Sequence, residues 1–181
     1  MSDATQTTAA DAGSSPIATT DAGARARAAL DAIDEPYEVI EVDPDLADTA
    51  AFSEHYGYPL EVSGNTIVVV TKRGERRFCA CVVLANTRLD VNHAVRPLLE
   101  TRKASFASAE ETAELTGMLI GGVTPFGLPD GLPLYIDARV MELDSVIVGG
   151  GDRSTKLQVS PQALARLPNA EVITDLAQSI G

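Results

Sequence analysis

The sequence is poor in basic residues, in cysteine and in long apolar stretches. Its 14 Lys and Arg stand against 26 Asp and Glu over 181 residues, which gives a formal net charge of −12. Such a charge repels phosphate at long range and excludes a broad surface that coats nucleic acid. A few well-placed cations would still suffice to bind one RNA end. We therefore expect no DNA partner.

No segment has the length of a membrane span or the pattern of a secretory signal. The apolar run at 78–85 is far shorter than the ~20 residues that a spanning helix requires. The first basic residue is Arg25, so the N-terminus lacks the charged start of a signal peptide. Residues 1–22 are low in complexity and carry only acidic charge, which predicts a disordered tail before an ordered domain at 23–181. We expect a cytoplasmic protein with no membrane partner.

Cys79 and Cys81 are the only cysteines, and they lie two residues apart in a strand-like run. On a strand they point to the same face, where half of a metal site or a redox pair is one interpretation. There is no second Cys pair, and His55 and His93 lie in different segments without the spacing of metal ligands. We favour two buried small side chains and expect neither a metal nor another cofactor.

The pattern of apolar and turn residues predicts a mixture of helices and strands. Residues 49–56 have the pattern of a helix that ends at Gly57. Two β-rich runs, Asn65 to Thr71 and Arg77 to Leu84, are joined by five residues that include Gly74, which predicts a hairpin. Ser108 and Glu111 have the spacing of a capping box. Further strands are predicted at 37–42, within 117–127, and at 134–136, 145–148 and 155–159, with helices near 24–33 and 161–167. The irregular alternation indicates a single mixed α/β, α+β-like domain.

Two glycine-rich segments are candidates for binding a ligand. In the first, Gly121 and Gly122 are followed by Thr124 and Pro125. A loop of this kind can present backbone N–H groups to a carbonyl or a phosphate, although a tight turn or bulge is the alternative. In the second, Gly149, Gly150 and Gly151 precede Arg153 between two β-rich runs, and a hairpin turn is again the alternative.

Asp137 follows an apolar strand, where it would either bind a substrate amine or anchor backbone N–H groups of a loop. No Ser, Cys or His has the local context of a nucleophile. A hydrolase with this sequence would therefore work by positioning an activated ester and a water molecule.

Taken together, three segments resemble the YbaK/EbsC family, which includes the editing insertion of bacterial prolyl-tRNA synthetases and its free-standing relatives. The segments are TGMLIGGVTPFG (116–127), LPLYIDA (132–138) and IVGGGDRSTKLQVSP (147–161). The resemblance extends over residues 24–178. It implies a curved, largely antiparallel sheet flanked by helices, with one pocket. It also implies hydrolysis of the ester between a wrong amino acid and the 3′ end of tRNA, without a metal or a covalent nucleophile.

The resemblance also implies which residues form the site. The positions carried over as catalytic are Asn65, Gly121 and Thr124. Those carried over as substrate-binding are Thr116, Gly122, Pro125, Asp137, Gly149, Gly150, Gly151 and Arg153, with Arg153 facing the RNA. The partners would be the 3′ end of an aminoacyl-tRNA and its small amino-acid moiety.

Asn65 departs from the family, which typically has a lysine at this position. Asparagine keeps a hydrogen-bonding head but has no charge. Lys72 cannot substitute for that lysine, because its odd offset along the strand points it to the opposite face, roughly 23 Å away. Three functions follow from this departure: a trans-acting deacylase of mischarged tRNA, a non-catalytic module that binds an amino-acid-like or nucleotide ligand, and a protein-interaction domain whose pocket is vestigial.

Overall fold

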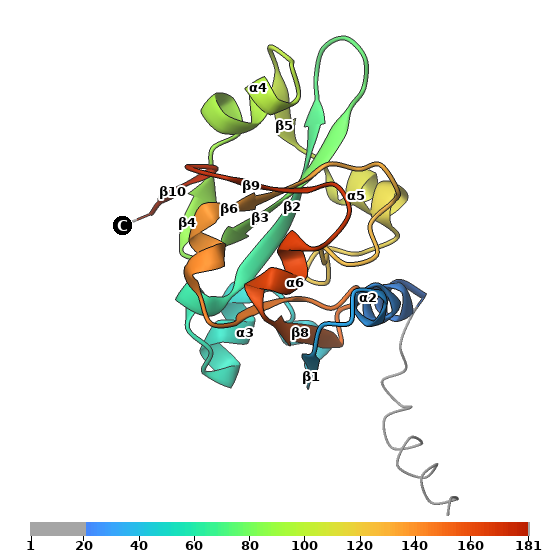
Figure 1. The fold of residues 1–181 in the computed structure, drawn as a ribbon, viewed down its shortest axis with the longest axis vertical. Coiled ribbons are helices and arrows are strands. Elements are labelled where there is room, and N and C mark those ends of the chain that lie inside the picture. Colours follow the sequence, from blue (N-terminus) through green and yellow to red (C-terminus); the bar gives the residue numbers. More distant parts are fainter. Residues whose placement is uncertain (1–20, 181) are drawn as a thin grey trace, which may run out of the picture.

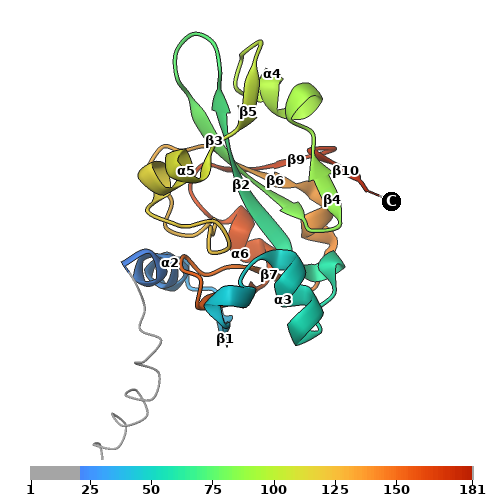
Figure 2. The same ribbon diagram turned by 180° about the vertical axis from the view of Figure 1, so that it is seen from behind.

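A long hairpin of two strands, β2 (Gly64–Thr71) and β3 (Phe78–Leu84), forms the centre of the computed structural model, which describes residues 21–180. The strands are antiparallel, with Asn65 opposite Val83. In Figures 1 and 2 the hairpin runs through the molecule and its turn projects at the top. The predicted hairpin is confirmed.

Strand β3 is buried on both faces, which explains its uninterrupted apolar sequence. One face packs in a core cluster with Leu30 and Phe126, and the other packs in a second cluster with Val95 and Leu176. Cys79 and Cys81 belong to the second cluster, with their sulfur atoms 3.9 Å apart. Both cysteines are fully buried, as predicted.

The remaining strands extend this hairpin into a five-stranded sheet and add two smaller sheets. The large sheet has the order β5-β2-β3-β6-β9, in which β6 and β9 run parallel to β3. The second sheet has the order β1-β8-β7, and the third pairs β10 with β4. Five of the seven pairings among the described strands are antiparallel. The additional strands are β1 (Tyr37–Glu41), β4 (Thr87–Leu89), β5 (Ala104–Phe106), β6 (Leu134–Asp137), β7 (Val146–Gly149), β8 (Thr155–Val159), β9 (Ala170–Ile173) and β10 (Ala177–Ser179).

Short helices flank the sheets, and their ends agree with local sequence signals. Gly57 adopts a left-handed conformation (φ 81°) and ends its helix, and Ser108 forms a capping box with Glu111. Within residues 21–180, no helix has the length and apolar character needed to cross a bilayer. The α-helices are α2 (Asp21–Ala32), α3 (Thr49–Tyr56), α4 (Arg96–Leu98), α5 (Ala109–Thr116) and α6 (Pro161–Ala165), and a π-helical turn at Val91–Val95 precedes α4.

The strand expected within residues 117–127 is wrong, because this segment is a loop. Gly117 ends α5 with φ 74°, and the Gly122 N–H donates to the carbonyl of Leu119 in a tight turn. Met118 is buried, whereas Leu119 and Ile120 are exposed. Local turn bonds therefore replace the ladder that a strand would need.

Helix α2 begins at Asp21, two residues before the predicted start of order. Ala22 is buried in a small cluster with Met118 and Val123, so residues 21–22 belong to the folded domain. The rest of the predicted tail, residues 1–20, lies outside the described residues.

The two glycine-rich segments pack against each other backbone to backbone. The Gly151 N–H donates to the carbonyl of Gly122 over 2.7 Å. A Cβ atom on Gly122 would lie 2.5 Å from the Asp152 carbonyl oxygen, and one on Gly149 would lie 2.2 Å from the Val123 carbonyl oxygen. Only glycine allows the two backbones to come so close. Both segments therefore need glycine for packing as well as for their turns.

We expect Gly149→Ala to lower the free energy of unfolding by about 3 kcal/mol, because the added methyl group meets rigid backbone. Gly131→Ala is the matched control, since nothing lies within 4 Å of its Cβ position and only its positive φ opposes a side chain. That control should lose about 1 kcal/mol. Urea denaturation measures the free energy of unfolding of both variants. Equal losses would show that the two glycine-rich segments can move apart without further cost to stability.

Candidate functional site

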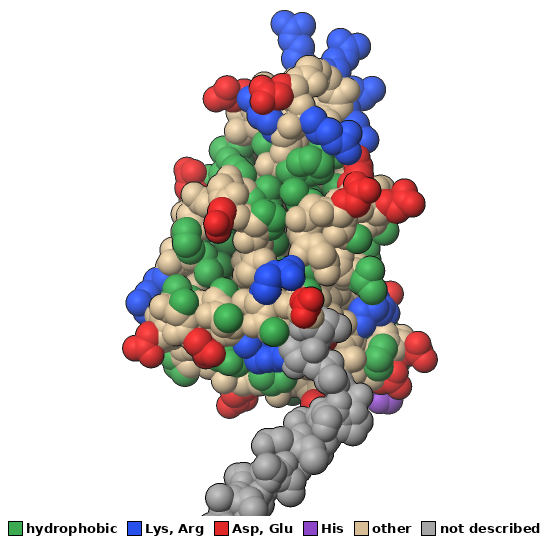
Figure 3. Space-filling model, turned by 90° about the vertical axis from the view of Figure 1, so that its right-hand side faces the viewer, with side chains coloured by type: hydrophobic (Ala, Val, Ile, Leu, Met, Phe, Trp, Pro, Cys, Tyr) green, Lys and Arg blue, Asp and Glu red, His purple; other side chains and the backbone are tan. Residues whose placement is uncertain are grey.

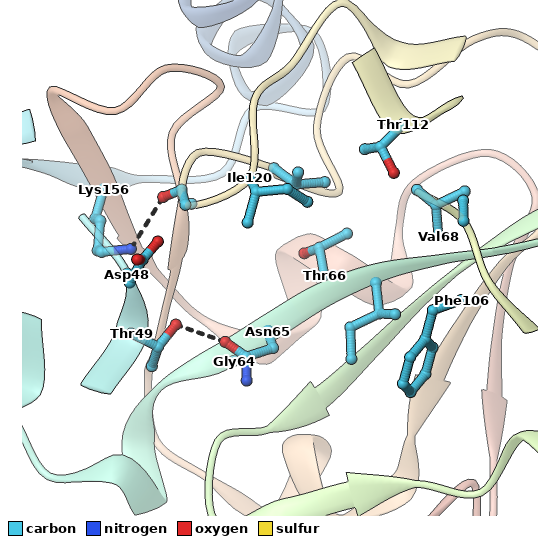
Figure 4. Close-up of a pocket in the computed structure, with 15 residues that line it drawn as sticks. Asp48, Thr49, Gly64, Asn65, Thr66, Val68, Phe106, Thr112, Ile120 and Lys156 are labelled. Atoms are coloured by element: carbon cyan, nitrogen blue, oxygen red, sulfur yellow. Dashed lines mark hydrogen bonds between the residues drawn. The ribbon is translucent and has the colours of Figure 1, made fainter. Parts of the chain in front are cut away.

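A pocket of about 450 Å³ opens between β2, the N-terminal end of α3 and the loop after α5 (Figure 4). This volume is typical of small-molecule sites. Apolar side chains from β2, β5 and the loop line one part, among them Ile67, Val68 and Phe106. Polar side chains gather at the other end, where Asp48, Thr49 and Lys156 are drawn together. The open pocket argues against the vestigial alternative.

Asn65 lines the polar part of this pocket from the start of β2. The Thr49 hydroxyl donates to its Oδ1 over 2.6 Å, which ties α3 to the strand and orients the amide. The next residue, Thr66, also lines the pocket, and its buried hydroxyl has no hydrogen-bond partner within the described chain. A buried hydroxyl without a partner costs roughly 1–3 kcal/mol, which a polar ligand atom would relieve.

Within residues 21–180, Lys156 is the only basic residue that lines the pocket. It comes from β8, opposite Gly149 of β7, and is 5% exposed. Its Nζ lies 3.5 Å from the Gly121 carbonyl oxygen and 5.1 Å from the centre of the Phe52 ring. It forms no ion pair with a carboxylate of the described chain. A cation therefore reaches the pocket from a strand remote from Asn65 in sequence.

Burial lowers the pKa of Lys156 to about 8. The charge of Asp48 opposes this shift and that of Arg153 adds to it. The difference from the ordinary value of 10.5 corresponds to roughly 3 kcal/mol that the folded protein loses by keeping the amine charged at neutral pH.

Arg153 connects three segments that surround the pocket. Its guanidinium donates to the carbonyl oxygens of Pro44, over 2.7 Å, and of Ile120, over 2.6 Å. It also pairs with Asp48 over 3.2 Å. The side chain thus holds the N-terminal end of α3 against the glycine loop.

Three of the predicted site residues line the pocket together: Asn65, Gly121 and Gly149. The others named from the resemblance lie behind or beside it. Thr124 is fully buried, and its backbone N–H points to the Met118 sulfur. Thr116 is buried and donates to the carbonyl of Thr112, which does line the pocket. Gly122, Gly150 and Gly151 are buried behind the lining, and Pro125 lines a separate cavity beside Ala29 and Leu134.

Asp137 lies outside the pocket lining and anchors backbone, which agrees with the second of its two interpretations. Its carboxylate accepts the N–H of Ala177 over 2.7 Å and that of Arg139 over 2.8 Å. The Arg139 guanidinium pairs with it at 3.1 Å. Asp137 therefore connects β6 to the C-terminal strand β10.

The sequence did not point to Thr49, Thr66 or Lys156 as pocket residues. Lys156 alternates with the apolar residues Leu157 and Val159 on β8, which predicts a solvent-facing side chain. No local signal could reveal it, because the elements that contact its amine, α3 and the loop after α5, come from elsewhere in the chain.

A sequence model described as an aminoacyl-tRNA editing domain matches residues 43–167. The uncharacterized protein YwhH of Bacillus subtilis is 32% identical over 76 residues, which cover 42% of this chain and 48% of YwhH. EbsC of Enterococcus faecalis, described as a candidate Cys-tRNA(Pro)/Cys-tRNA(Cys) deacylase, is 23% identical over 90 residues, which cover 50% of this chain and 54% of EbsC. The chain thus spans about half the length of the curated relatives it matches.

Solved structures share the fold over most of the chain. A candidate trans-editing enzyme for prolyl-tRNA synthetase superposes with a TM-score of 0.74 at 24% identity, covering 91% of this chain and all of the other. The hypothetical protein APE2540 superposes with a TM-score of 0.75 at 25% identity, covering 85% and 99%. The mixed α/β fold predicted from the resemblance is confirmed. The chain belongs to the aminoacyl-tRNA editing domain family.

Proposed function

We propose that this protein is a trans-acting deacylase that hydrolyses the ester of a mischarged tRNA in the cytoplasm. One observation carries the proposal: in a chain of the editing family, an open pocket joins an apolar part to a polar end that holds Asn65 and a buried lysine. An aminoacyl ester matches this arrangement, because its amino-acid side chain would occupy the apolar part and its polar ester group the polar end. The relatives described as candidate editing enzymes support this assignment.

In the proposed reaction, water attacks the carbonyl carbon of the ester, and the bond to the ribose oxygen breaks. The products are the free amino acid and the tRNA 3′ hydroxyl. Negative charge develops on the carbonyl oxygen, and fixed donors that face it lower the barrier. The Asn65 amide and the Lys156 ammonium are the donors that we assign to this role, while Gly121 and Thr124 shape the loop beside them.

We propose further that Lys156 supplies the charge that Asn65 lacks. Its burial without a carboxylate partner lowers stability, and such costs persist where function requires them. A pKa of about 8 leaves the amine mostly charged at neutral pH, so it can stabilise an oxyanion there.

The uncharged Asn65 favours one second candidate, a module that binds an aminoacyl-like ligand without hydrolysing it. The same pocket would then bind amino acids or aminoacyl-adenylate analogues and raise the melting temperature. Such a shift without ester hydrolysis on any mischarged tRNA would support the second candidate over the first.

Deacylation of a panel of mischarged tRNAs, including Ala-tRNA(Pro) and Cys-tRNA(Pro), tests the proposed function. We expect the wild type to hydrolyse at least one of them, and Asn65→Ala to lower kcat/KM at least tenfold because it removes a donor to the ester. Asn92→Ala is the matched control, since Asn92 is exposed and lies outside this pocket. Wild-type protein that leaves every mischarged tRNA intact at micromolar concentration would refute the deacylase.

Lys156→Met tests the role of the buried amine. We expect deacylation to fall at least tenfold while the free energy of unfolding at pH 7 rises by about 1–3 kcal/mol, because a buried charge is replaced by an apolar chain of similar length. Urea denaturation and the deacylation assay measure the two effects.

The pH dependence of unfolding gives an independent check on Lys156. Between about pH 8 and 10.5 the unfolded chain holds a Lys156 proton that the folded protein has released, so the contribution of Lys156 to stability should rise with pH across this window, whereas the raised pKa of Cys81 acts in the opposite direction. Lys156→Met should lack this rise, whereas Lys103→Met, at an exposed position, should keep it. Lower stability of the Lys156→Met variant with an unchanged pH profile would show that the charge does not destabilise the fold.

A further inference from the structure

Basic side chains gather at one end of this acidic molecule. In Figure 3 they lie at the top of the molecule, with a few acidic side chains beside them, at the end where the turn between β2 and β3 projects in Figure 1. Two segments provide them, residues 72–77 and residues 102–103, and together they hold six of the 14 basic residues and a single acidic residue, Glu75. We call this group the hairpin patch: Lys72, Arg73, Arg76, Arg77, Arg102 and Lys103.

The fold brings these two segments together from separate parts of the sequence. Strand β5 pairs with the end of β2, with Ala104 opposite Thr71. The Lys72 N–H then donates to the carbonyl of Lys103 over 2.8 Å. Both loops are exposed, so the cations of one segment add to the field of the other.

Most of the cations in the hairpin patch form no ion pair. Arg76 pairs with Glu111, and Arg77 donates to the carbonyl of Glu100 over 3.2 Å. No ion pair within residues 21–180 involves the other four cations, Lys72, Arg73, Arg102 and Lys103. A solvated hairpin tip needs no such convergence of like charges, which repel each other until an anion binds.

The hairpin patch lies at a fixed distance from the pocket along the same strands. Asn65, which we assign to the ester, precedes Lys72 by seven residues, roughly 23 Å along an extended chain, and Lys72 follows directly after β2 ends at Thr71. Phe106 lines the pocket and Lys103 precedes it by three residues, about 10 Å away. In a stacked helix each strand places one phosphate about every 3.4 Å of axial length. The patch therefore corresponds to phosphates about seven nucleotides from an ester held at Asn65, beyond the CCA end.

We propose that the hairpin patch binds the phosphate backbone of the tRNA acceptor stem, next to the CCA end whose ester occupies the pocket. This rests on the proposed function and adds the surface that holds the RNA. The strongly acidic remainder of the molecule repels the rest of the tRNA, so the patch also orients the substrate with its 3′ end toward the pocket.

Binding of fluorescently labelled, uncharged tRNA(Pro) at 50 to 200 mM salt tests the patch separately from catalysis. Relative to wild type, we expect Lys72→Ala/Arg73→Ala to bind about tenfold or more weakly at 100 mM salt. The slope of log K against log salt should become shallower by about 2, because two phosphate contacts are lost. The control Arg27→Ala/Arg166→Ala removes the same charge from α2 and the end of α6, far from the hairpin turn (Figure 1), and should keep the wild-type slope.

Hydrolysis of an aminoacylated CCA trinucleotide distinguishes failure of the patch from failure of the deacylase. The trinucleotide is too short to reach the hairpin patch, so the Lys72/Arg73 variant should hydrolyse it at the wild-type rate while losing activity on full-length tRNA. Equal salt slopes for variant and wild type would overturn the patch even if deacylation occurs. Wild-type binding to phosphatidylserine vesicles but not to tRNA would overturn it as well. Binding of tRNA through the patch without hydrolysis of either substrate would uphold the patch and refute the deacylase.

Discussion

The close contact between the two glycine-rich segments is the constraint on which the site depends. Gly151 donates to the Gly122 carbonyl, and the neighbouring backbones approach so closely that a Cβ atom has no room. This contact positions the loop after α5 beside the β1-β8-β7 sheet. The carbonyl of Gly121 therefore lies next to Lys156. Arg153 then ties the same loop to the N-terminal end of α3. The part of the pocket wall formed by this loop is thus held in place by backbone contacts.

Lys156 places a positive charge in a pocket whose residue on β2, Asn65, carries none. Asn65 faces the pocket from β2 and accepts a hydrogen bond from Thr49, which a lysine could not do. The cation comes instead from β8, deep in the structure and without a carboxylate partner. Its lowered pKa and its cost to stability have the same physical cause, the loss of hydration on burial.

Charge is distributed so that the molecule has one basic end and an acidic remainder. The net charge of −12 excludes broad contact with RNA, yet the hairpin patch concentrates cations where β2 and β5 leave the pocket. The patch directly follows β2 and directly precedes β5, two strands that line the pocket, so the sheet sets the distance between patch and pocket. A substrate that satisfies both would need an ester and a phosphate backbone at that spacing.

The sequence by itself determined the local elements with strong signals. The helix stop at Gly57, the capping box of Ser108 and the β2-β3 hairpin all follow from short-range chemistry, and each is present. The resemblance of three segments identified the family and the mixed α/β fold. It also named Asn65, Gly121 and Gly149 as site residues, and these three line the pocket. Asp137, named in the same way, lies outside the lining and anchors backbone.

Only the tertiary structure decided what the long-range contacts create. The segment after Gly117 is apolar enough for a strand, but turn bonds and the burial of Met118 make it a loop. Lys156 has the sequence pattern of an exposed strand residue, and it becomes a buried pocket cation because α3 and the loop after α5 cover it. The hairpin patch needs Lys72 beside Lys103, two residues that are distant in sequence and adjacent only through the β2-β5 pairing. Burial and proximity depend on which distant segments meet, and a local pattern does not contain that information.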